Sequence, residues 1–298
     1  MSTTPRLDEG LVRQAVALAL EEDLQGKEDI TTRAVVPEER PAQARIFARR
    51  PGILAGVPVA LEVFRTLDPE VQVVHVLEDG TELEEGEDIL VLKGRAWGLL
   101  GGERSALNFL AKLSGIATLT RKFVDLVTGT GVAILETRKT TPGLRRLEKY
   151  AVSVGGGQNH RLGLYDKILL KENHFALSVE GTGLDAYRRT VARAVRYARG
   201  KGPVAAEART AEEALAAVEG GADIVLLDNM SPPELEATVS RGKRAAREVG
   251  REVLFEASGG VTLENVLDVA RTGVDRISVG AITHSALPLD LSMLVTGL

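Results

Sequence analysis

The sequence feature that most constrains the fold is a repeating pattern of short apolar runs after about residue 130. Six of these runs are rich in β-branched and aliphatic residues, and they cover residues 132–136, 167–171, 203–208, 223–228, 252–258 and 275–280. Such runs are typical of parallel strands that are buried on both faces. The segments between most of them begin with Ser, Thr or Pro and end with Gly, as helices do. The pattern predicts a closed or nearly closed parallel β/α barrel, with an open doubly wound sheet as the alternative.

The first part of the chain has a less regular pattern. Residues 11–22 show the apolar spacing of a helix, and residues 101–128 show it again. Short β-prone runs lie between these two segments, at residues 45–48, 71–77 and 89–93. We therefore expect a mixed α+β domain here, in which Gly115 breaks the second helical segment into two pieces.

Composition limits the class of protein. A length of 298 residues with 44% hydrophobic content allows a sizeable core in one large or two modest domains. No apolar run approaches the roughly 18 residues of a membrane span, and the N-terminus shows no secretory signal. The absence of cysteine excludes disulfides, zinc–thiolate sites and thiol nucleophiles, so a cytoplasmic location is expected. The net charge of −5 argues against a nucleic-acid-binding protein.

The segment from Glu136 to His174 reverses this acidic balance, with eight Lys or Arg residues against four acids. A local excess of positive charge attracts anions. The basic residues are mixed with Gly, Thr, Asn and Gln, a composition that favours a pocket for a small, multiply negative ligand. Three of them have helical spacing and are predicted to lie on a charged helix face: Arg145, Arg146 and Lys149.

The strongest candidates for a site follow the predicted strands, because barrel active sites lie at the carboxyl ends of the strands. Charged or hydroxyl groups lie at the ends of the first four strands or directly after them, at Thr137, Arg138, Lys139, Lys171, Glu207 and Asp228. Gly-rich segments end the last two strands, at Ser258, Gly259, Gly260, Ser278, Val279 and Gly280. Each turn alone is also typical of an ordinary tight loop, but two on consecutive final strands favour phosphate binding.

Other residue types in this region indicate particular ligands. The carboxylates of Glu207 and Asp228 could hold Mg²⁺ together with oxygens of a substrate phosphate. They could also accept hydrogen bonds from sugar hydroxyls, or form a structural ion pair with Lys139 or Lys171. His160 and Arg161 follow a Gly-rich loop, and the planar guanidinium of arginine favours carboxylate recognition.

All of these residues except Glu207 belong to six ordered motifs, ETRKTTPGLR, GGGQNHRLGLYD, ILLKENH, LLDNM, EASGGV and ISVGAITHS. In this order and spacing the chain resembles quinolinate phosphoribosyltransferase, also called nicotinate-nucleotide pyrophosphorylase (carboxylating). Two upstream stretches are similar as well, GGERSALNFLAKLSGIAT and DLQGKEDITT. The resemblance implies an α/β fold with an N-terminal α+β sandwich domain over residues 1–115 and an incomplete parallel β/α barrel over residues 116–284. The tail, residues 285–298, is expected to return to the first domain.

The resemblance also implies a reaction, in which the phosphoribosyl group of phosphoribosyl pyrophosphate (PRPP) is transferred to quinolinate in the presence of Mg²⁺. The products are nicotinate mononucleotide, pyrophosphate and CO₂, for de novo NAD synthesis. A homodimer or a dimer-based higher oligomer is implied, with Arg104 completing the site of the neighbouring subunit. No nucleic acid or membrane takes part.

Roles for the candidate residues follow from the same resemblance. The quinolinate carboxylates would be bound by Arg104, Thr137, Arg138, His160 and Arg161. Lys139 and Lys171 would lie by the pyrophosphate and the reacting carboxylate, Glu207 and Asp228 would serve the ribose hydroxyls and the metal, and the two Gly-rich turns would hold the 5′-phosphate. One departure is Ala205, where many relatives carry a further acid, which leaves less acidic charge for a metal.

Three alternatives stay open at this point. The first is a phosphoribosyltransferase of the same fold that acts on nicotinate or another aromatic acid, although His160, Arg161 and Arg104 favour a substrate with two carboxylates. The second is a Schiff-base aldolase that uses Lys171. The third is a non-catalytic nucleotide- or RNA-binding module that uses residues 138–171.

Overall fold

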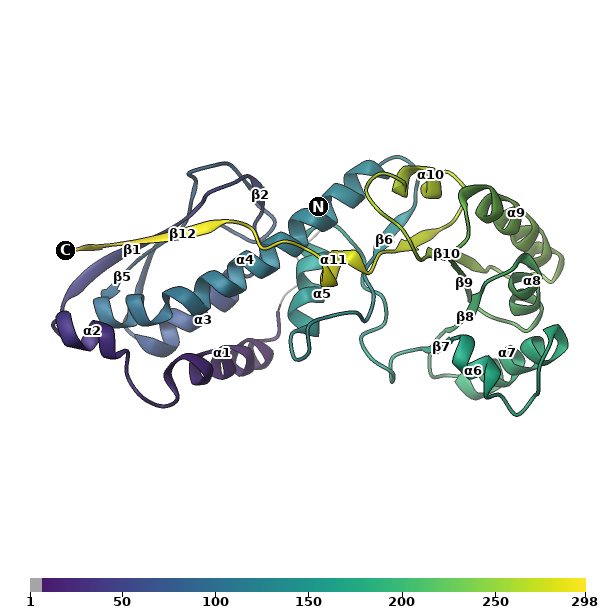
Figure 1. The fold of residues 1–298 in the computed structure, drawn as a ribbon, viewed down its shortest axis with the longest axis horizontal. Coiled ribbons are helices and arrows are strands. Elements are labelled where there is room, and N and C mark those ends of the chain that lie inside the picture. Colours follow the sequence, from purple (N-terminus) through teal and green to yellow (C-terminus); the bar gives the residue numbers. More distant parts are fainter. Residues whose placement is uncertain (1–6) are drawn as a thin grey trace. The chain divides into compact units, whose positions relative to one another are not determined.

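The computed structural model describes residues 7–298, and Figure 1 shows their helices and strands. Residues 1–6, part of the stretch in which no secretory signal is predicted, lie outside the described residues. By their contacts the described residues form two compact units. The first holds the chain up to Arg121 together with Thr140–Gly156 and Ile282–Leu298, and the second holds Lys122–Lys139 and Gly157–Ala281. The domain boundaries derived from the sequence, at residues 115 and 284, stay a prediction.

The first unit is built on an antiparallel sheet with the strand order β12-β1-β5-β3. These strands are β1 (Pro41–Ala48), β3 (Gln72–Val76), β5 (Asp88–Arg95) and β12 (Leu291–Gly297). Ala44 of β1 lies opposite Val295 on one side and Leu92 on the other, so the C-terminal tail forms a strand of the sheet. A short antiparallel pair, β2 (Gly52–Ile53) and β4 (Glu82–Leu83), lies apart from it.

Helices bury the apolar residues of the first unit. They are α1 (Glu9–Leu24), α2 (Ile30–Val35), α3 (Val57–Leu67), α4 (Ala96–Leu126) and α5 (Arg145–Val154). The buried residues of α3, including Val59, Val63 and Phe64, recur at helical spacing. Burying a side chain such as Phe64 contributes roughly 1.5–3 kcal/mol. Asp8 caps α1 by accepting a hydrogen bond of 2.8 Å from the amide of Leu11.

Gly115 does not break α4, so that prediction is wrong: the helix is continuous from Ala96 to Leu126. A Cβ atom added at Gly115 would lie 2.1 Å from the carbonyl oxygen of Leu287. Glycine is required here because the chain that leads into β12 crosses the helix at this point. The glycine permits a close backbone approach rather than ending the helix.

The predicted charged face of α5 is correct for Arg146, which is exposed, and wrong for Lys149. The Lys149 side chain is buried, and so are its neighbours Glu148 and Tyr150. Lys112 of α4 lies 3.4 Å from Glu148, which shows that α5 is covered on this side. Spacing alone cannot reveal that a helix is covered on more than its apolar face.

Among the described residues, the second unit has a six-stranded parallel sheet with the order β6-β11-β10-β9-β8-β7. The strands are β6 (Ala133–Leu135), β7 (Ile168–Leu170), β8 (Val204–Ala208), β9 (Ile224–Asp228), β10 (Leu254–Ser258) and β11 (Arg276–Ser278). Strands that are consecutive in sequence are neighbours from β7 to β11, and β6 then pairs with β11. This is the order of a barrel in which β6 and β7 do not pair, so the predicted incomplete parallel barrel is confirmed.

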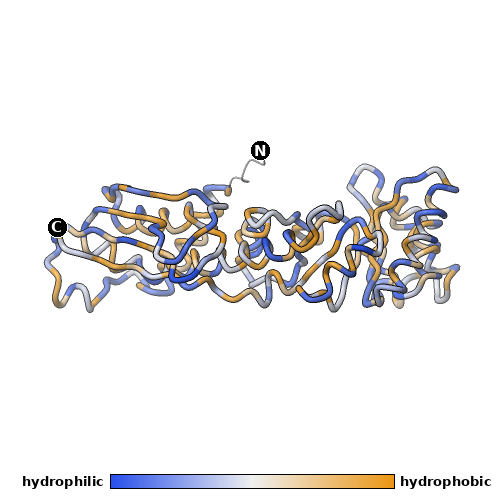
Figure 2. The backbone as a smooth tube through the Cα atoms, turned by 90° about the horizontal axis from the view of Figure 1, so that it is seen from above, coloured by the Kyte–Doolittle hydropathy of each residue, from blue (hydrophilic) through white to orange (hydrophobic). Residues whose placement is uncertain are grey.

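Helices separate the strands of the second unit as expected (Figure 1). They are α6 (Glu172–Ala176), α7 (Leu184–Ala198), α8 (Ala211–Glu219), α9 (Pro232–Glu248) and α10 (Val266–Ala270), and a short helix, α11 (Ala281–His284), follows the last strand. Thr210 caps α8 and Ser231 forms a capping box with Glu234 of α9. In Figure 2, hydrophobic and hydrophilic stretches alternate along the chain in both units. No helix within residues 7–298 is long and apolar enough to cross a membrane.

Candidate functional site

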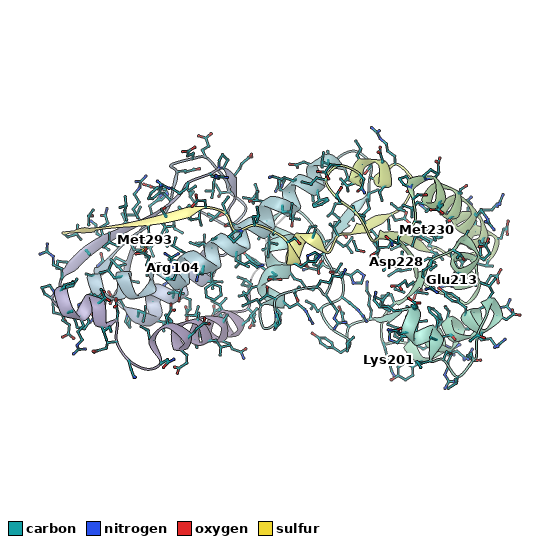
Figure 3. The ribbon with its side chains drawn as sticks, in the orientation of Figure 1. Arg104, Lys201, Glu213, Asp228, Met230 and Met293 are labelled. Carbon is teal, nitrogen blue, oxygen red and sulfur yellow. The ribbon has the colours of Figure 1, made fainter. Side chains whose placement is uncertain are left out.

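The parallel sheet of the second unit brings the predicted strand-end residues to one rim. Ser258 of β10 lies in register with Asp228 of β9 on one side and with Ser278 of β11 on the other. Ser278 in turn lies opposite Leu135, so the chain from Thr137 onwards leaves the sheet at the same level. Carboxyl ends of parallel strands are where ligands bind in α/β folds. Figure 3 labels Asp228 at this position.

An ion pair joins the ends of β7 and β8 at this rim. Lys171 Nζ lies 2.9 Å from Glu207 Oε2, and the Glu207 side chain is only 10% exposed. Burial raises the pKa of Asp228 above its ordinary value, and the neighbouring Glu207 carboxylate adds to that rise. Lys171, Lys139 and Arg209 oppose it, so these charges act on one another across the rim. The arrangement presents a carboxylate pair and two lysines to the same space.

The start of α6 fixes Lys171 and Glu207. The backbone amide of Lys171 donates to His174 Nδ1 at 2.9 Å, which gives His174 a structural role. The amide of Glu172 donates to Glu207 Oε1 at 3.4 Å. Tyr187 of α7 donates its hydroxyl to the Glu207 carbonyl at 2.7 Å. The Tyr187 ring also stacks on that of Phe175, with centroids 3.9 Å apart. We did not predict Tyr187 or Phe175, because nothing in the helical pattern distinguishes them from core aromatics.

The two Gly-rich turns differ in exposure. In the first, Gly259 and Gly260 are exposed and have positive φ angles of 91° and 63°. A Cβ atom at Gly259 would lie 3.1 Å from the backbone nitrogen of Asn229, so glycine is needed there. In the second turn, Ser278 and Val279 are buried, and the Val279 amide donates to the Leu135 carbonyl at 2.8 Å. The first turn is therefore the more open of the two toward a ligand.

Two arginines lie close together on the other side of the rim. Burial lowers the pKa of the Arg161 guanidinium, and the nearby charge of Arg138 lowers it further. Arg161 is 7% exposed, and its Nη1 donates to the Lys167 carbonyl at 3.2 Å. Neither its Nε nor that of Arg138 has a hydrogen-bond partner among the described residues. The Asp166 carboxylate offsets part of this repulsion, and an anionic ligand between the two arginines would offset more of it.

A buried carboxylate lies beneath these arginines. Glu256 of β10 has no exposed surface, and its two oxygens lie 3.2 Å from His160 Nε2 and 3.1 Å from Arg276 Nε. Burial lowers the pKa of Lys167, and the positive charge of Arg276 lowers it further, whereas the negative charge of Glu256 raises it. We did not predict Glu256, Arg276 or Lys167. Glu256 interrupts an otherwise apolar strand, which is the signal that could have found it, whereas Arg276 is the first residue of β11 and has no comparable signal.

Arg104 is the one predicted site residue that belongs to the first unit. It lies on α4, and its side chain is exposed (Figure 3). Its contribution to a neighbouring subunit stays a prediction.

The described residues contain no group of three or more His, Asp or Glu side chains that could hold a metal ion. Glu207 and Asp228 are two mutually repelling carboxylates, which suits a divalent cation only if a ligand supplies the remaining oxygens. Ala205 is fully buried and packs with Leu169, Ile224 and Leu226 in an apolar cluster. Position 205 therefore belongs to the apolar core and supplies no further carboxylate to the rim.

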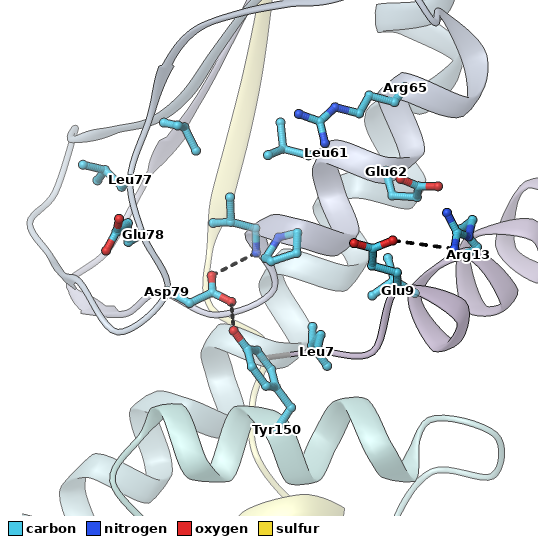
Figure 4. A pocket seen from close by; sticks show the side chains of 14 residues that line it. Leu7, Glu9, Arg13, Leu61, Glu62, Arg65, Leu77, Glu78, Asp79 and Tyr150 are labelled. Atoms are coloured by element: carbon cyan, nitrogen blue, oxygen red, sulfur yellow. Dashed lines mark hydrogen bonds and ion pairs between the residues drawn. The ribbon is translucent and has the colours of Figure 1, made fainter. Parts of the chain in front are cut away.

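A cavity of about 720 Å³ lies in the first unit, lined by residues of α1, α3, the segment after β3, and Tyr150 (Figure 4). Tyr150 donates its hydroxyl to Asp79 at 2.6 Å, and Asp79 also accepts the amides of Gly56 and Val57 at the start of α3. Burial raises the pKa of Asp79. These contacts account for Asp79 as a helix cap, and none of the predicted site residues lines the cavity.

Comparison with known proteins is consistent with this architecture. The model of the quinolinate phosphoribosyl transferase N-terminal domain matches residues 29–114, and that of the C-terminal domain matches residues 116–294. The nicotinate-nucleotide pyrophosphorylase [carboxylating] of Mycobacterium leprae is 43% identical over 285 residues, which cover 94% of this chain and 96% of that protein. The crystal structure of NadC from Streptococcus pyogenes has a TM-score of 0.89 at 36% identity, with 99% of each chain covered.

A more distant structure shares the fold alone. Human nicotinic acid phosphoribosyltransferase is 16% identical with a TM-score of 0.60, and the match covers 96% of this chain and 74% of that one. The full-length matches at higher identity argue against the aldolase and RNA-binding alternatives, and they confirm the family and enzyme class predicted from the sequence. The chain belongs to the quinolinate phosphoribosyltransferase family.

Proposed function

We propose that this protein transfers the phosphoribosyl group of PRPP to quinolinate and releases CO₂ and pyrophosphate, leaving nicotinate mononucleotide for NAD synthesis. We also propose that it does so in the cytoplasm as a homodimer, in which Arg104 of one subunit contacts quinolinate in the other. The names of its relatives support the reaction. The observation that carries it on this chain is the excess of buried and half-buried positive charge around Arg161.

The charge around Arg161 matches a dianion. Among the described residues of the second unit, four cationic side chains are gathered here: Arg138, Arg161, Lys167 and Arg276. Two buried carboxylates, Glu136 and Glu256, lie among them, and the exposed carboxylate of Asp166 acts on Arg161 and Lys167 from the surface. The buried and half-buried groups alone therefore carry an excess of two positive charges, which the two carboxylates of quinolinate would neutralise, whereas nicotinate carries only one carboxylate. The site should therefore bind quinolinate more tightly than nicotinate, because a buried charge left without a partner costs several kcal/mol.

The opposite part of the rim suits the phosphoribosyl group. The bond between ribose C1 and pyrophosphate can break through an oxocarbenium-like state, so no nucleophilic side chain is required. Glu207 and Asp228 face the positive charge that develops on the ribose, and Lys139 and Lys171 face the leaving pyrophosphate. The exposed amides of Gly259 and Gly260 are available to the 5′-phosphate. Mg²⁺ bound by PRPP oxygens would be held against Glu207 and Asp228 and would neutralise part of the phosphate charge.

Decarboxylation then takes place on the quinolinate side of the rim. Once the ring nitrogen has formed its bond to ribose it is positively charged, and it stabilises the electron pair left on C2 when CO₂ departs. The buried surroundings of Arg161 keep water away from that carboxylate, which favours loss of the charged group over its solvation. A proton from solvent then completes the product.

The experiment incubates the full chain with PRPP, Mg²⁺ and either quinolinate or nicotinate, and measures nicotinate mononucleotide and CO₂. We expect CO₂ and mononucleotide in equal amounts from quinolinate. Turnover of nicotinate alone would refute the proposal.

A variant pair tests the role of the buried charge. In Arg161→Gln the KM for quinolinate should rise by between about 10-fold and 100-fold, because a hydrogen bond to a charged group is lost. Arg241→Gln removes an exposed arginine on α9, 3.7 Å from Glu212, and should leave this KM unchanged.

A further inference from the structure

We propose that Glu256 is a positioning residue for quinolinate binding: it holds His160 as the Nε2–H tautomer, and His160 in turn fixes the backbone that presents Arg161. This inference rests on the proposed function, and it assigns a role to a residue that itself lies beneath the substrate site. The buried cluster under the arginines would then serve substrate binding.

The hydrogen bond between adjacent residues 160 and 161 determines the state of the histidine. The Arg161 amide donates to His160 Nδ1 at 2.9 Å, so Nδ1 acts as an acceptor and carries no proton. The ring proton of the neutral side chain therefore resides on Nε2. That nitrogen faces Glu256 Oε1 at 3.2 Å, which is the partner this tautomer needs.

A second carboxylate fixes the backbone at the same position. Glu136, directly after β6, accepts the His160 amide at 3.0 Å through Oε2. His160 is thus held by its backbone from β6 and by its ring from β10, and both it and Arg161 are 7% exposed. A change in the ring orientation would withdraw the acceptor from the Arg161 amide and shift the guanidinium relative to Arg138.

The negative charge of Glu256 contributes in addition to its contact with His160. Burial alone would raise the pKa of Glu256, but His160, Arg276 and Lys167 hold it below its ordinary value, so the carboxylate is ionised. It compensates Arg276, which lies opposite it in the β10–β11 register. Without this negative charge, the repulsion of Lys167 by Arg276 and Arg161 would be uncompensated, which would leave the arginine pair less well placed for two carboxylates.

The first test is kinetic and uses Glu256→Gln in the full chain. We expect the KM for quinolinate to rise about 10-fold, the equivalent of one charge-assisted hydrogen bond, while the KM for PRPP and kcat change by less than about twofold. The control is Asp275→Asn, which also removes a carboxylate from this sheet. Asp275 accepts the Phe255 amide at 2.7 Å and pairs with Lys243 at 2.7 Å, before the start of β11. It should lower thermal stability and leave the KM for quinolinate unchanged.

The second test needs no variant. Nitrogen-15 NMR of the wild-type histidine rings, of which the chain has four, should show His160 protonated at Nε2 and not at Nδ1. A ring protonated at Nδ1 overturns the proposal, and so does a Glu256→Gln enzyme whose KM for quinolinate equals that of the wild type. Equal rises in the KM for quinolinate and the KM for PRPP would also overturn the proposal, because a general loss of structure would raise both values. If the wild-type enzyme does not turn over quinolinate, the proposed function is wrong. If the wild type turns over quinolinate and Glu256→Gln has the same KM, the proposed function stands and only the role of Glu256 is wrong.

Discussion

Asp228→Asn should stabilise the protein while abolishing product formation, because the Asp228 carboxylate is half-buried and lies near the Glu207 carboxylate. Glu207 lies opposite Leu226 in the register of β8 and β9, and Asp228 follows Leu226 by two residues. A lateral spacing of about 4.8 Å and a rise of about 6.6 Å put the two Cα atoms about 8 Å apart. At an effective dielectric constant of about 20, two charges at this distance repel by about 2 kcal/mol. Solvent and the nearby lysines reduce this, so we expect a gain of about 1 kcal/mol.

The gain must depend on pH, and its sign follows from the pKa shift. The pKa of Asp228 is raised in the folded protein above the value of 3.8 that it has when unfolded. The folded state therefore binds this proton more tightly, and its stability increases as the pH falls through the raised pKa. Above that pKa the ionised carboxylate destabilises the fold. Asparagine removes this cost, so the gain should be full at pH 7 and should shrink as the pH approaches 4.

Thermal unfolding measured between pH 7 and pH 4 is the assay. A gain of about 1 kcal/mol corresponds to roughly 2–4 °C in Tm. The control is Asp223→Asn just before the start of the same strand, where the carboxylate has attractive contacts: it accepts the Val204 amide at 2.8 Å and lies 3.2 Å from Arg251. That variant should lower Tm. The reasoning is refuted if Asp228→Asn gives no gain at pH 7, or if the gain persists unchanged at low pH.

Two further substitutions test the packing around the site and the helix. Tyr187→Phe keeps the ring stacked on Phe175 but removes the donor to the Glu207 carbonyl, so the free energy of unfolding should fall by about 1–3 kcal/mol and the KM for PRPP should rise. An unchanged KM would show that this bond does not position Glu207. Gly115→Ala places a Cβ against the Leu287 carbonyl and should cost about 1–3 kcal/mol in denaturant unfolding. Gly101→Ala in the same helix meets only Leu67 at 3.7 Å and should stabilise by about 0.5–1 kcal/mol; equal effects of the two would contradict this account.

The barrel could be predicted because its signals are local. A parallel strand buried on both faces is a short apolar run wherever it occurs, and Thr210 and Ser231 cap the following helices with their own side chains. The change from apolar to charged residues at a strand end marks the rim, since a buried strand cannot hold unpaired charges. Strand order then brought Lys171, Glu207 and Asp228 together without any further assumption.

Predictions that depended on distant chain segments were less successful. Lys149 and Gly115 have local signals for a solvated helix face and a helix break, yet both are overruled by segments far away in the sequence. The buried state of Lys149 depends on what covers α5, and the requirement for Gly115 depends on where residue 287 crosses α4. Neither is encoded in the surrounding residues.

Glu256 and Arg276 show that a site can also depend on charges that look misplaced. Glu256 interrupts the apolar strand β10 and Arg276 begins β11, and either charge left without its partner would destabilise the fold by several kcal/mol. They are tolerated because the β10–β11 register places them opposite each other. Since the pair is neutral, it cannot by itself bind an anion, and the surplus positive charge above it comes from Arg138, Arg161 and Lys167. The carboxylate therefore does not weaken anion binding at the rim; it permits three more cations to gather there in a fixed arrangement, which an apolar floor could not do.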